Sequence, residues 1–313
     1  MKNIIVTHND LDGAVSASMI IRELTKYNGL YSIVPVMYLG NRTYHTEMLD
    51  TLIKSHFSST GNKVFVVDFP WHPLADVWID HHKTSERHSP PEARKYLLPM
   101  LSSAAEATTI YLGDADPDYV ESVNSTWAIE WAGKIDSAKY ESPDEYFKCA
   151  NPWLVLRLFT DHDKQAHKTA RIAELLAHHD FDADIVVDII GGAQKAIEKF
   201  QHDINLVGPA IVENGGVGII VTRHRNDFPR YAEYIVRPDI DFSIRVTNTE
   251  RDKREIRVGH NIWKPKSNKD IGRIMADLFP DSGGGHPGVG GAIVEENEYS
   301  DSLDKIWAEL TRE

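Results

Sequence analysis

The chain has almost no cysteine. Cys149 is the only one among 313 residues, so an intramolecular disulfide and zinc sites that need two or more cysteines are excluded. A secreted, disulfide-stabilised scaffold is therefore disfavoured, and a reducing, cytoplasmic location is expected. Long apolar runs are also missing, because no stretch approaches the roughly 18 residues that a membrane-spanning helix needs. We therefore expect no membrane partner.

Positive charge is scarce as well. Lys and Arg number 34 against 47 Asp and Glu, which gives a net charge of −13 with histidine neutral. An extensive binder of double-stranded nucleic acid needs a strong positive field, so an extended duplex is not an expected partner. A small anionic substrate stays compatible with this charge if a metal ion supplies positive charge locally.

Strand and helix signals alternate in the first half of the chain, which predicts an α/β fold with a mostly parallel sheet. Short apolar and β-branched runs predict strands at 3–7, 32–39, 64–67 and 77–79. Helices are predicted at 14–24, 45–57, 119–134, 167–179 and 183–204. A capping box at 103–106 predicts the start of one more helix, which continues through Tyr111. The length predicts about two domains. We place the first at 1–205, with a helical extension and a connector helix at its end.

The remaining residues, 206–313, are predicted to form a smaller α/β domain. Strands are expected at 217–221, 242–246, 254–258 and 292–294, and helices at 228–236, 271–279 and 302–310. A glycine-rich loop is expected at 283–291.

Acidic and histidine residues follow three of the predicted strands. They are His8, Asp10 and Asp12 after the first, Asp68 after another, and Asp80, His81 and His82 after a third. The carboxyl ends of parallel strands share one edge of a sheet, so these side chains can converge. Taken singly, each has an ordinary alternative as a helix cap, a turn or a surface loop. Together, aspartates and imidazoles suit Mn²⁺, Mg²⁺ or Co²⁺, and a pair of such ions can clamp a phosphoryl group.

These residues resemble a known family. The segment 8–13, Asp68 and the tripeptide 80–82 look like the first three motifs of the DHH phosphoesterase superfamily. The run 283–286 is similar to the signature of the DHH-associated C-terminal domain. The motifs occur in the family's order at both ends of the chain. The resemblance implies a Rossmann-like N-terminal domain, a smaller C-terminal domain and a metal-dependent phosphoesterase activity.

The resemblance also implies roles for the first three motifs. Asp10, Asp12 and Asp68 match ligands of two divalent ions, with Mn²⁺ the first choice and Asp68 the bridge between them. His81 matches a further metal ligand, and His82 matches the histidine that faces the scissile phosphate. Asp80 would orient the imidazoles. His8 is either a ligand or a neighbour that only hydrogen-bonds beside the site.

The family's fourth motif is an aspartate in the helical part, and two residues compete for it. Asp136 ends a predicted helix at about the expected distance after the tripeptide. Asp161 lies farther along the chain. We prefer Asp136, because the helix before it carries apolar residues that could pack on the sheet.

The C-terminal domain is expected to bind substrate. Gly283, Gly284 and Gly285 could turn backbone N–H groups toward an anion, and His286 could donate to a phosphate oxygen. Arg245 resembles a strand arginine that contacts substrate phosphate in related proteins. The alternatives are a flexible glycine turn and a surface arginine.

The resulting hypothesis is a metal-dependent phosphoesterase for short oligonucleotides or small nucleotides, similar to nanoRNases and 3′-phosphoadenosine 5′-phosphate phosphatases. Alternatives are a RecJ-like single-strand exonuclease, a cyclic-dinucleotide phosphodiesterase and, from another class, a non-catalytic nucleotide-binding protein. The sequence leaves open whether the chain forms a homodimer.

Overall fold

A computed structural model describes residues 2–36, 49–55, 63–119, 122–162, 166–222, 228–249, 252–265 and 267–312. The chain divides into two compact units. The first contains Met1–Lys139 and Cys149–Ala196, and the second contains Tyr140–Lys148 and Ile197–Glu313. The short segment Tyr140–Lys148 therefore belongs to the second unit although the first unit flanks it in sequence. No helix in the described ranges is long and apolar enough to cross a membrane.

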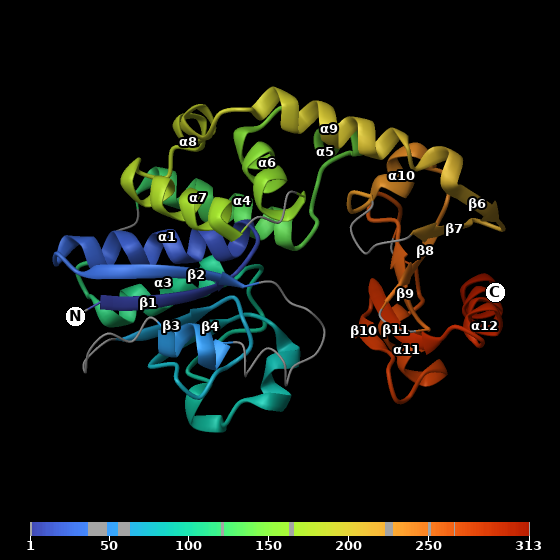
Figure 1. The fold of residues 1–313 in the computed structure, drawn as a ribbon, viewed down its shortest axis with the longest axis horizontal. Helices are drawn as coiled ribbons and strands as arrows, with labels where there is room; N and C mark the ends of the chain where they lie inside the picture. The colour runs from blue at the N-terminus through green and yellow to red at the C-terminus, as the bar shows by residue number, and fades with distance from the viewer. Residues whose placement is uncertain are drawn as a thin grey trace. The chain divides into compact units, whose positions relative to one another are not determined.

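The first unit is built on a five-stranded parallel sheet with the order β2-β1-β3-β4-β5 (Figure 1). β3 and β4 are buried along their whole length, as expected for parallel strands covered on both faces. The predicted α/β class and parallel sheet are thus confirmed. Residues 37–39 of the second predicted strand lie outside the described ranges. The strands are β1 Lys2–His8, β2 Leu30–Val36, β3 Val64–Val67, β4 Val77–Asp80 and β5 Tyr96–Leu97.

Helix α1 (Leu11–Lys26) is the central helix of this unit. It is buried from Leu11 to Ile21 because α3, α4 and α7 pack against it, and Figure 1 shows it lying along the sheet. A π-helical turn at Leu158–His162 precedes α7. Residues 49–55 are also helical. The other helices are α3 Ala104–Ala115, α4 Val123–Asp136, α6 Pro152–Arg157, α7 Ala166–His178 and α8 Ala183–Ile190.

The predicted connector helix over 183–204 is wrong, because the structure has two helices there. α8 ends at Ile190, and α9 runs from Ala193 to Asn205. Gly191 and Gly192 between them have φ angles of 67° and 74°. This left-handed conformation is readily available to glycine and ends an α-helix.

The second unit has a six-stranded mixed sheet with the order β10-β11-β9-β8-β7-β6. α11 and α12 cover one face, and Met275 and Ile306 are fully buried in the core between them and the sheet. The strands are β6 Ile211–Asn214, β7 Val217–Thr222, β8 Phe242–Asn248, β9 Lys253–His260, β10 Gly284–His286 and β11 Val289–Glu295. The helices are α5 Pro143–Lys148, α10 Ala232–Val236, α11 Ile271–Leu278 and α12 Tyr299–Thr311.

Segment Tyr140–Lys148 supplies part of this second core. Tyr146 is fully buried and its hydroxyl donates to the carbonyl of Arg230 at 2.6 Å. Its ring also contacts those of Phe200, Tyr231 and Trp263. The unit is therefore assembled from two stretches of chain.

Two expectations for this unit need correction. The helix predicted at 228–236 is shortened to α10, because Tyr231 before it has a φ angle of 63°. The glycine loop predicted at 283–291 is instead a hairpin of β10 and β11. A side chain at Gly283 would place its Cβ 2.1 Å from the carbonyl oxygen of Met275. Glycine thus lets this segment approach α11 closely.

Candidate metal centre

The sheet order explains why three distant motifs meet. β1, β3 and β4 are consecutive parallel strands, and they lead into His8, Asp68 and Asp80 at one edge of the sheet. In such sheets ligands bind at the carboxyl ends of the strands. The predicted convergence is therefore a consequence of the topology.

Seven of the predicted residues form three linked clusters whose ligand atoms lie within 4.8 Å of one another. Asp68 belongs to two of the clusters, and so does His81. Such shared members make the clusters one continuous group of oxygen and nitrogen donors. The clusters are His8–Asp10–Asp68, Asp68–His81–His82 and Asp12–His81–Asp136.

Asp68 is the most informative member. Its two carboxylate oxygens are buried, and neither accepts a hydrogen bond from a described donor. Nδ1 of His8 and Nε2 of His81 lie 3.7 Å from them. Its backbone has a φ angle of 52°, a left-handed conformation that costs energy and is often found at functional sites. A buried carboxylate without donors fits a bound cation.

Asp12 is fixed by the beginning of α3. Its Oδ2 accepts the backbone N–H of Ala104 at 2.7 Å, and its Oδ1 accepts that of Ala105 at 2.9 Å. These are first-turn N–H groups, which have no partner within the helix and which favour a negative charge. The capping box at Ser103 predicts where this helix starts, but nothing in the local pattern indicates that the helix end meets Asp12.

The buried carboxylates repel one another. Burial, followed by the charges of Asp136 and Asp10, raises the pKa of Asp12 well above its usual range. Burial, followed by Asp10 and Asp12, does the same to the pKa of Asp68. A divalent cation would offset this repulsion and keep both groups ionised.

His81 is suited to be a neutral metal ligand. Its Nε2 lies 3.6 Å from Asp12, 3.7 Å from Asp68 and 3.5 Å from Asp136, and no described group forms a hydrogen bond with it. Burial, followed by the neighbouring His82, lowers the pKa of His81. The unprotonated imidazole is the form that binds a metal.

His82 has the opposite electrostatic state because of Asp80. Nδ1 of His82 lies 2.8 Å from Oδ1 of the fully buried Asp80. The same oxygen accepts the backbone N–H of His81 at 2.8 Å. Burial opposes protonation of His82, but the hydrogen bond and charge of Asp80, together with the charges of Asp68 and Asp136, outweigh it and raise the pKa to about 10. Asp80 thus contacts the imidazole of His82 and only the backbone of His81.

His8 is paired with Asp10. Its Nδ1 lies 2.5 Å from Oδ2 of Asp10, whose Oδ1 accepts the N–H of Gly13 at 2.9 Å and caps α1. Burial opposes protonation of His8, but Asp10 outweighs it, so that the pKa of His8 is raised. His8 also belongs to the Asp68 cluster, so both roles expected for it stay compatible with its position.

The two aspartates that compete for the fourth motif lie in different places. Asp136, at the end of α4, approaches His81. Gly133 has no side chain, which lets α4 lie close to Ser102. A Cβ at this position would be 2.4 Å from Oγ of Ser102. Asp161 lies in the π-helical turn, and its charge helps to raise the pKa of His8. It belongs to none of the clusters found in the described ranges.

In the second unit, the guanidinium of Arg245 already forms hydrogen bonds with other groups of the protein. Its Nε lies 2.8 Å from Oε1 of Glu233, and its Nη2 bonds to the other oxygen of that carboxylate. Nη1 and Nη2 also donate to the carbonyls of Phe228 and Pro229 at 3.1 and 2.6 Å. Little of the guanidinium is left for a substrate.

A second arginine, Arg257, lies closer to the glycine segment. Four residues lie opposite one another in a row across neighbouring strands of the sheet. They are Gly284 on β10, Gly291 on β11, Arg257 on β9 and Arg245 on β8. Directly opposed residues share a face of the sheet, so Arg257 stands between Arg245 and bare glycine backbone. A Cβ at Gly284 would meet nothing within 4 Å. No sequence motif singles out Arg257, although it alternates with Ile256 and Val258 as Arg245 does with its neighbours.

The glycine segment is partly structural. The N–H of Gly283 donates to the carbonyl of Phe279 at 2.6 Å and is therefore not available to an anion. Gly285 has a φ angle of 152°, and a Cβ there would lie 2.2 Å from the carbonyl oxygen of Val289. The side chain of His286 lies outside the described part of the structure.

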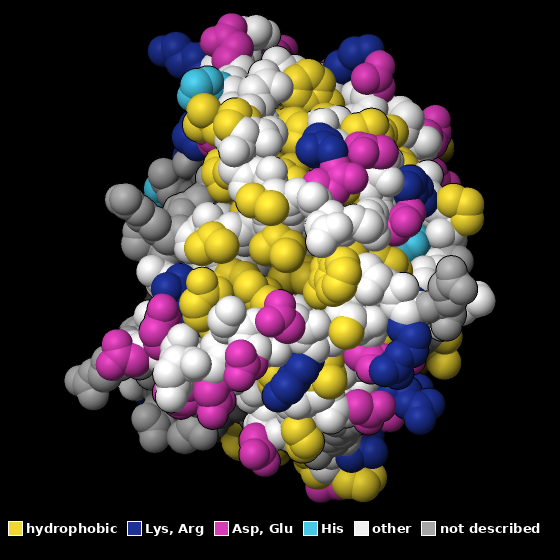
Figure 2. All heavy atoms as spheres, turned by 90° about the vertical axis from the view of Figure 1, so that its right-hand side faces the viewer, with side chains coloured by type: hydrophobic (Ala, Val, Ile, Leu, Met, Phe, Trp, Pro, Cys, Tyr) yellow, Lys and Arg dark blue, Asp and Glu magenta, His cyan; other side chains and the backbone are white. Residues whose placement is uncertain are grey.

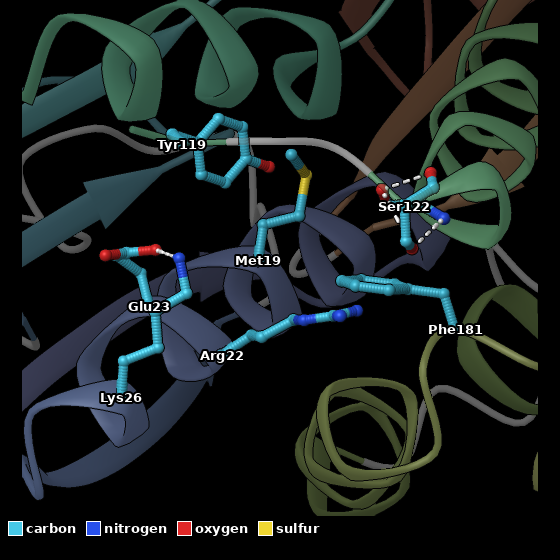
Figure 3. Close-up of a pocket in the computed structure, with 8 residues that line it drawn as sticks. Met19, Arg22, Glu23, Lys26, Tyr119, Ser122 and Phe181 are labelled. Carbon is cyan, nitrogen blue, oxygen red and sulfur yellow. Dashed lines mark hydrogen bonds and ion pairs between the residues drawn. The ribbon is translucent and has the colours of Figure 1, made fainter. Parts of the chain in front are cut away.

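A pocket along the C-terminal half of α1 contains none of the candidate residues (Figure 3). Its cations are already paired, Lys26 with Glu23 at 2.5 Å and Arg22 with Asp180. It therefore offers no free positive charge to an anionic ligand. The pocket is lined by Met19, Arg22, Glu23, Lys26, Tyr119, Ser122, Ser125 and Phe181.

Comparison with known proteins places this geometry in context. No family model matches the sequence, and no curated protein is similar enough to match. A solved structure of a pGpG-specific phosphodiesterase, PggH from Vibrio cholerae, is similar at 17% identity and a TM-score of 0.65, covering 99% of this chain and 98% of that one. The DHH domain of a member of the s1p family of ribosomal proteins is similar at 15% identity and a TM-score of 0.64, covering 99% and 87%. The chain therefore has a DHH-type α/β fold, as its motifs implied.

Proposed function

We propose that the protein is a metal-dependent phosphoesterase. The observation that carries this proposal is the buried carboxylate of Asp68, which accepts no hydrogen bond from the residues that the structure describes and is shared between two clusters of potential ligands. Asp10, Asp12, Asp68, His81 and Asp136 would hold two divalent ions, with Mn²⁺ the first choice and His8 at the edge of the site. When bound, such ions polarise a phosphate oxygen and lower the pKa of a water molecule.

The protein's own contribution starts with His82. Because Nδ1 is committed to Asp80, Nε2–H is the donor left for a substrate. The side chain is 41% exposed, and its hydrogen bond to the carboxylate of Asp80 favours the protonated ring. We propose that it neutralises charge that develops on the phosphate oxygens.

The second unit is proposed to bind a further phosphate of the substrate. Arg257 takes this role in our proposal in preference to Arg245, because Glu233 already holds Arg245 from two sides. The side chain of Arg257 is 32% exposed, and its guanidinium bonds to Glu255 at 3.0 to 3.1 Å. A phosphate could compete for it bidentately. His286 and the backbone near Gly284 stay predicted contacts of the substrate. The division into domains 1–205 and 206–313 also stays a prediction.

Short substrates are favoured over long strands. The protein with a similar fold from Vibrio cholerae acts on pGpG, which supports a linear dinucleotide as substrate. The net charge is −13, and cations and anions are interspersed on the face in Figure 2. That face shows no continuous basic strip of the kind that follows a long single strand.

The test is a panel of substrates assayed with Mn²⁺ and with EDTA. It contains pGpG, other RNA dinucleotides, 3′-phosphoadenosine 5′-phosphate, a cyclic dinucleotide and single strands of about twenty nucleotides, beyond the footprint of one binding module. We expect metal-dependent hydrolysis, fastest on the dinucleotides. Faster cleavage of the long strands would favour the RecJ-like alternative. Nucleotide binding without hydrolysis under any divalent ion would favour a binding protein.

A further inference from the structure

We infer that Thr169 on α7 is a positioning residue for the loop that carries His8 and Asp10, and that it acts through the side chain of Asn9. The inference rests on the proposed function, since it concerns how that loop holds a metal ion. Nothing in the sequence motifs indicates such a link, because Thr169 and Asn9 are 160 positions apart.

The link is a buried hydrogen bond. Oγ1 of Thr169 donates to Oδ1 of Asn9 at 2.6 Å. Thr169 is 0% exposed and Asn9 is 5% exposed. Water therefore cannot readily replace the hydroxyl if it is removed, and the amide oxygen of Asn9 would be left buried without a donor.

Two anchors from outside the β1–α1 connection converge on Asn9. Its backbone N–H donates to the carbonyl of Val36 at 2.9 Å, and its side chain is held by Thr169. The hydrogen bond of Asp10 to Gly13, in contrast, stays within the connection itself. Asn9 therefore transmits the positions of β2 and α7 to the two candidate ligands that flank it.

Asn9 has little else to hold its side chain. Its Nδ2 is buried and has no hydrogen-bond partner among the described residues. Without the Thr169 hydroxyl, both ends of the amide would lack a partner, and rotation of the side chain would disturb the flanking peptides. Loss of a group that supports metal ligands typically weakens metal binding by about 10-fold to 100-fold.

The experiment measures Mn²⁺ binding to the metal-free, full-length protein by calorimetry. Thr169→Val removes the hydroxyl and keeps the shape, whereas Thr169→Ser restores the hydroxyl. Ser18→Ala is the control, because Ser18 is fully buried on α1 and its hydroxyl donates to the carbonyl of Val15 within the same helix. We expect Mn²⁺ to bind T169V at least about 10-fold more weakly, and T169S and S18A with nearly wild-type affinity.

A double-mutant cycle with Asn9→Ala tests the path of the effect. If Thr169 acts through Asn9, the double variant binds Mn²⁺ no more weakly than N9A alone, and N9A carries the test if T169V does not fold. Wild-type Mn²⁺ affinity in T169V, or additive losses of Mn²⁺ affinity in the double variant, would overturn the role of Thr169 and leave the proposed function standing. If the wild-type protein bound no divalent ion, the proposed function would fail, and this role of Thr169 with it.

Discussion

Arg257 on β9 lies directly opposite Gly291 on β11, which carries no side chain, and its guanidinium bonds to Glu255 two positions along the same strand. Arg245, its partner on the other side, is held by Glu233. Two arginines in one row of the sheet therefore have different surroundings, and the difference is testable.

Arg257→Ala should lower kcat/KM on dinucleotides by about 10-fold to 100-fold, the equivalent of one charge-assisted hydrogen bond. Mn²⁺ affinity and the melting temperature should change little. Arg254→Ala is the matched control, since Arg254 lies on the same strand and pairs with Glu296 as Arg257 pairs with Glu255. A larger loss for Arg245→Ala, in a protein that stays equally stable, would return the phosphate contact to Arg245.

Glu233→Gln should instead act on stability. Burial opposes ionisation of Glu233, but Arg245 outweighs it and lowers the pKa of the carboxyl. A lowered pKa in the folded state means that the pair stabilises above the unfolded value of about 4.3 and that this contribution is lost as the pH falls through the folded value. The variant should lose up to about 3–5 kcal/mol at pH 7.

Urea unfolding from neutral pH down to acid checks the Glu233 prediction. The gap between the wild type and E233Q should shrink as the pH falls, because the wild-type carboxylate then becomes neutral too. A gap that stays constant across this range would show that the charge of Glu233 is not the cause.

Asp68→Asn should separate metal binding from folding. Burial and the charges of Asp10 and Asp12 disfavour an ionised carboxyl at position 68, so a neutral amide there should let the metal-free variant melt at or above the wild-type temperature. The rise in melting temperature that Mn²⁺ gives the wild type should disappear, and turnover should fall by more than about 100-fold. Thermal unfolding with and without Mn²⁺ is the measurement, and an undiminished Mn²⁺ effect would remove Asp68 from the ligand set.

Asp136→Asn and Asp161→Asn decide the fourth motif. Asp136 shares a cluster with Asp12 and His81, whereas Asp161 affects His8 from the π-helical turn. We expect D136N to need at least about 10-fold more Mn²⁺ for half-maximal turnover and D161N to need much less. The reverse order in the Mn²⁺ titration would favour Asp161 as the ligand.

Local patterns predicted much of this architecture. The buried runs 64–67 and 77–79 became β3 and β4, and the residues after them meet because parallel strands end at one edge. The break between α8 and α9 was missed although its glycines are visible in the sequence, because the apolar pattern on both sides is helical.

Other parts depend on tertiary contacts that no local pattern contains. The N–H groups of Ala104 and Ala105 reach Asp12 only because α3 packs on α1. The different roles of Arg245 and Arg257 likewise depend on Glu233, which approaches from α10. Both arginines look alike along their strands, so sequence alone could not rank them.

The path of the chain has a consequence for dissecting the protein. Because Tyr140–Lys148 belongs to the second unit, the backbone passes between the units three times. One proteolytic cut at any of these passages would still leave a fragment that carries residues of both units. A fragment starting at Ile197 would lack Tyr146, whose ring fills the core and whose hydroxyl holds Arg230. Expression of the C-terminal portion by itself should therefore yield an unstable product, whereas co-expression with a peptide spanning 140–148 should improve its folding.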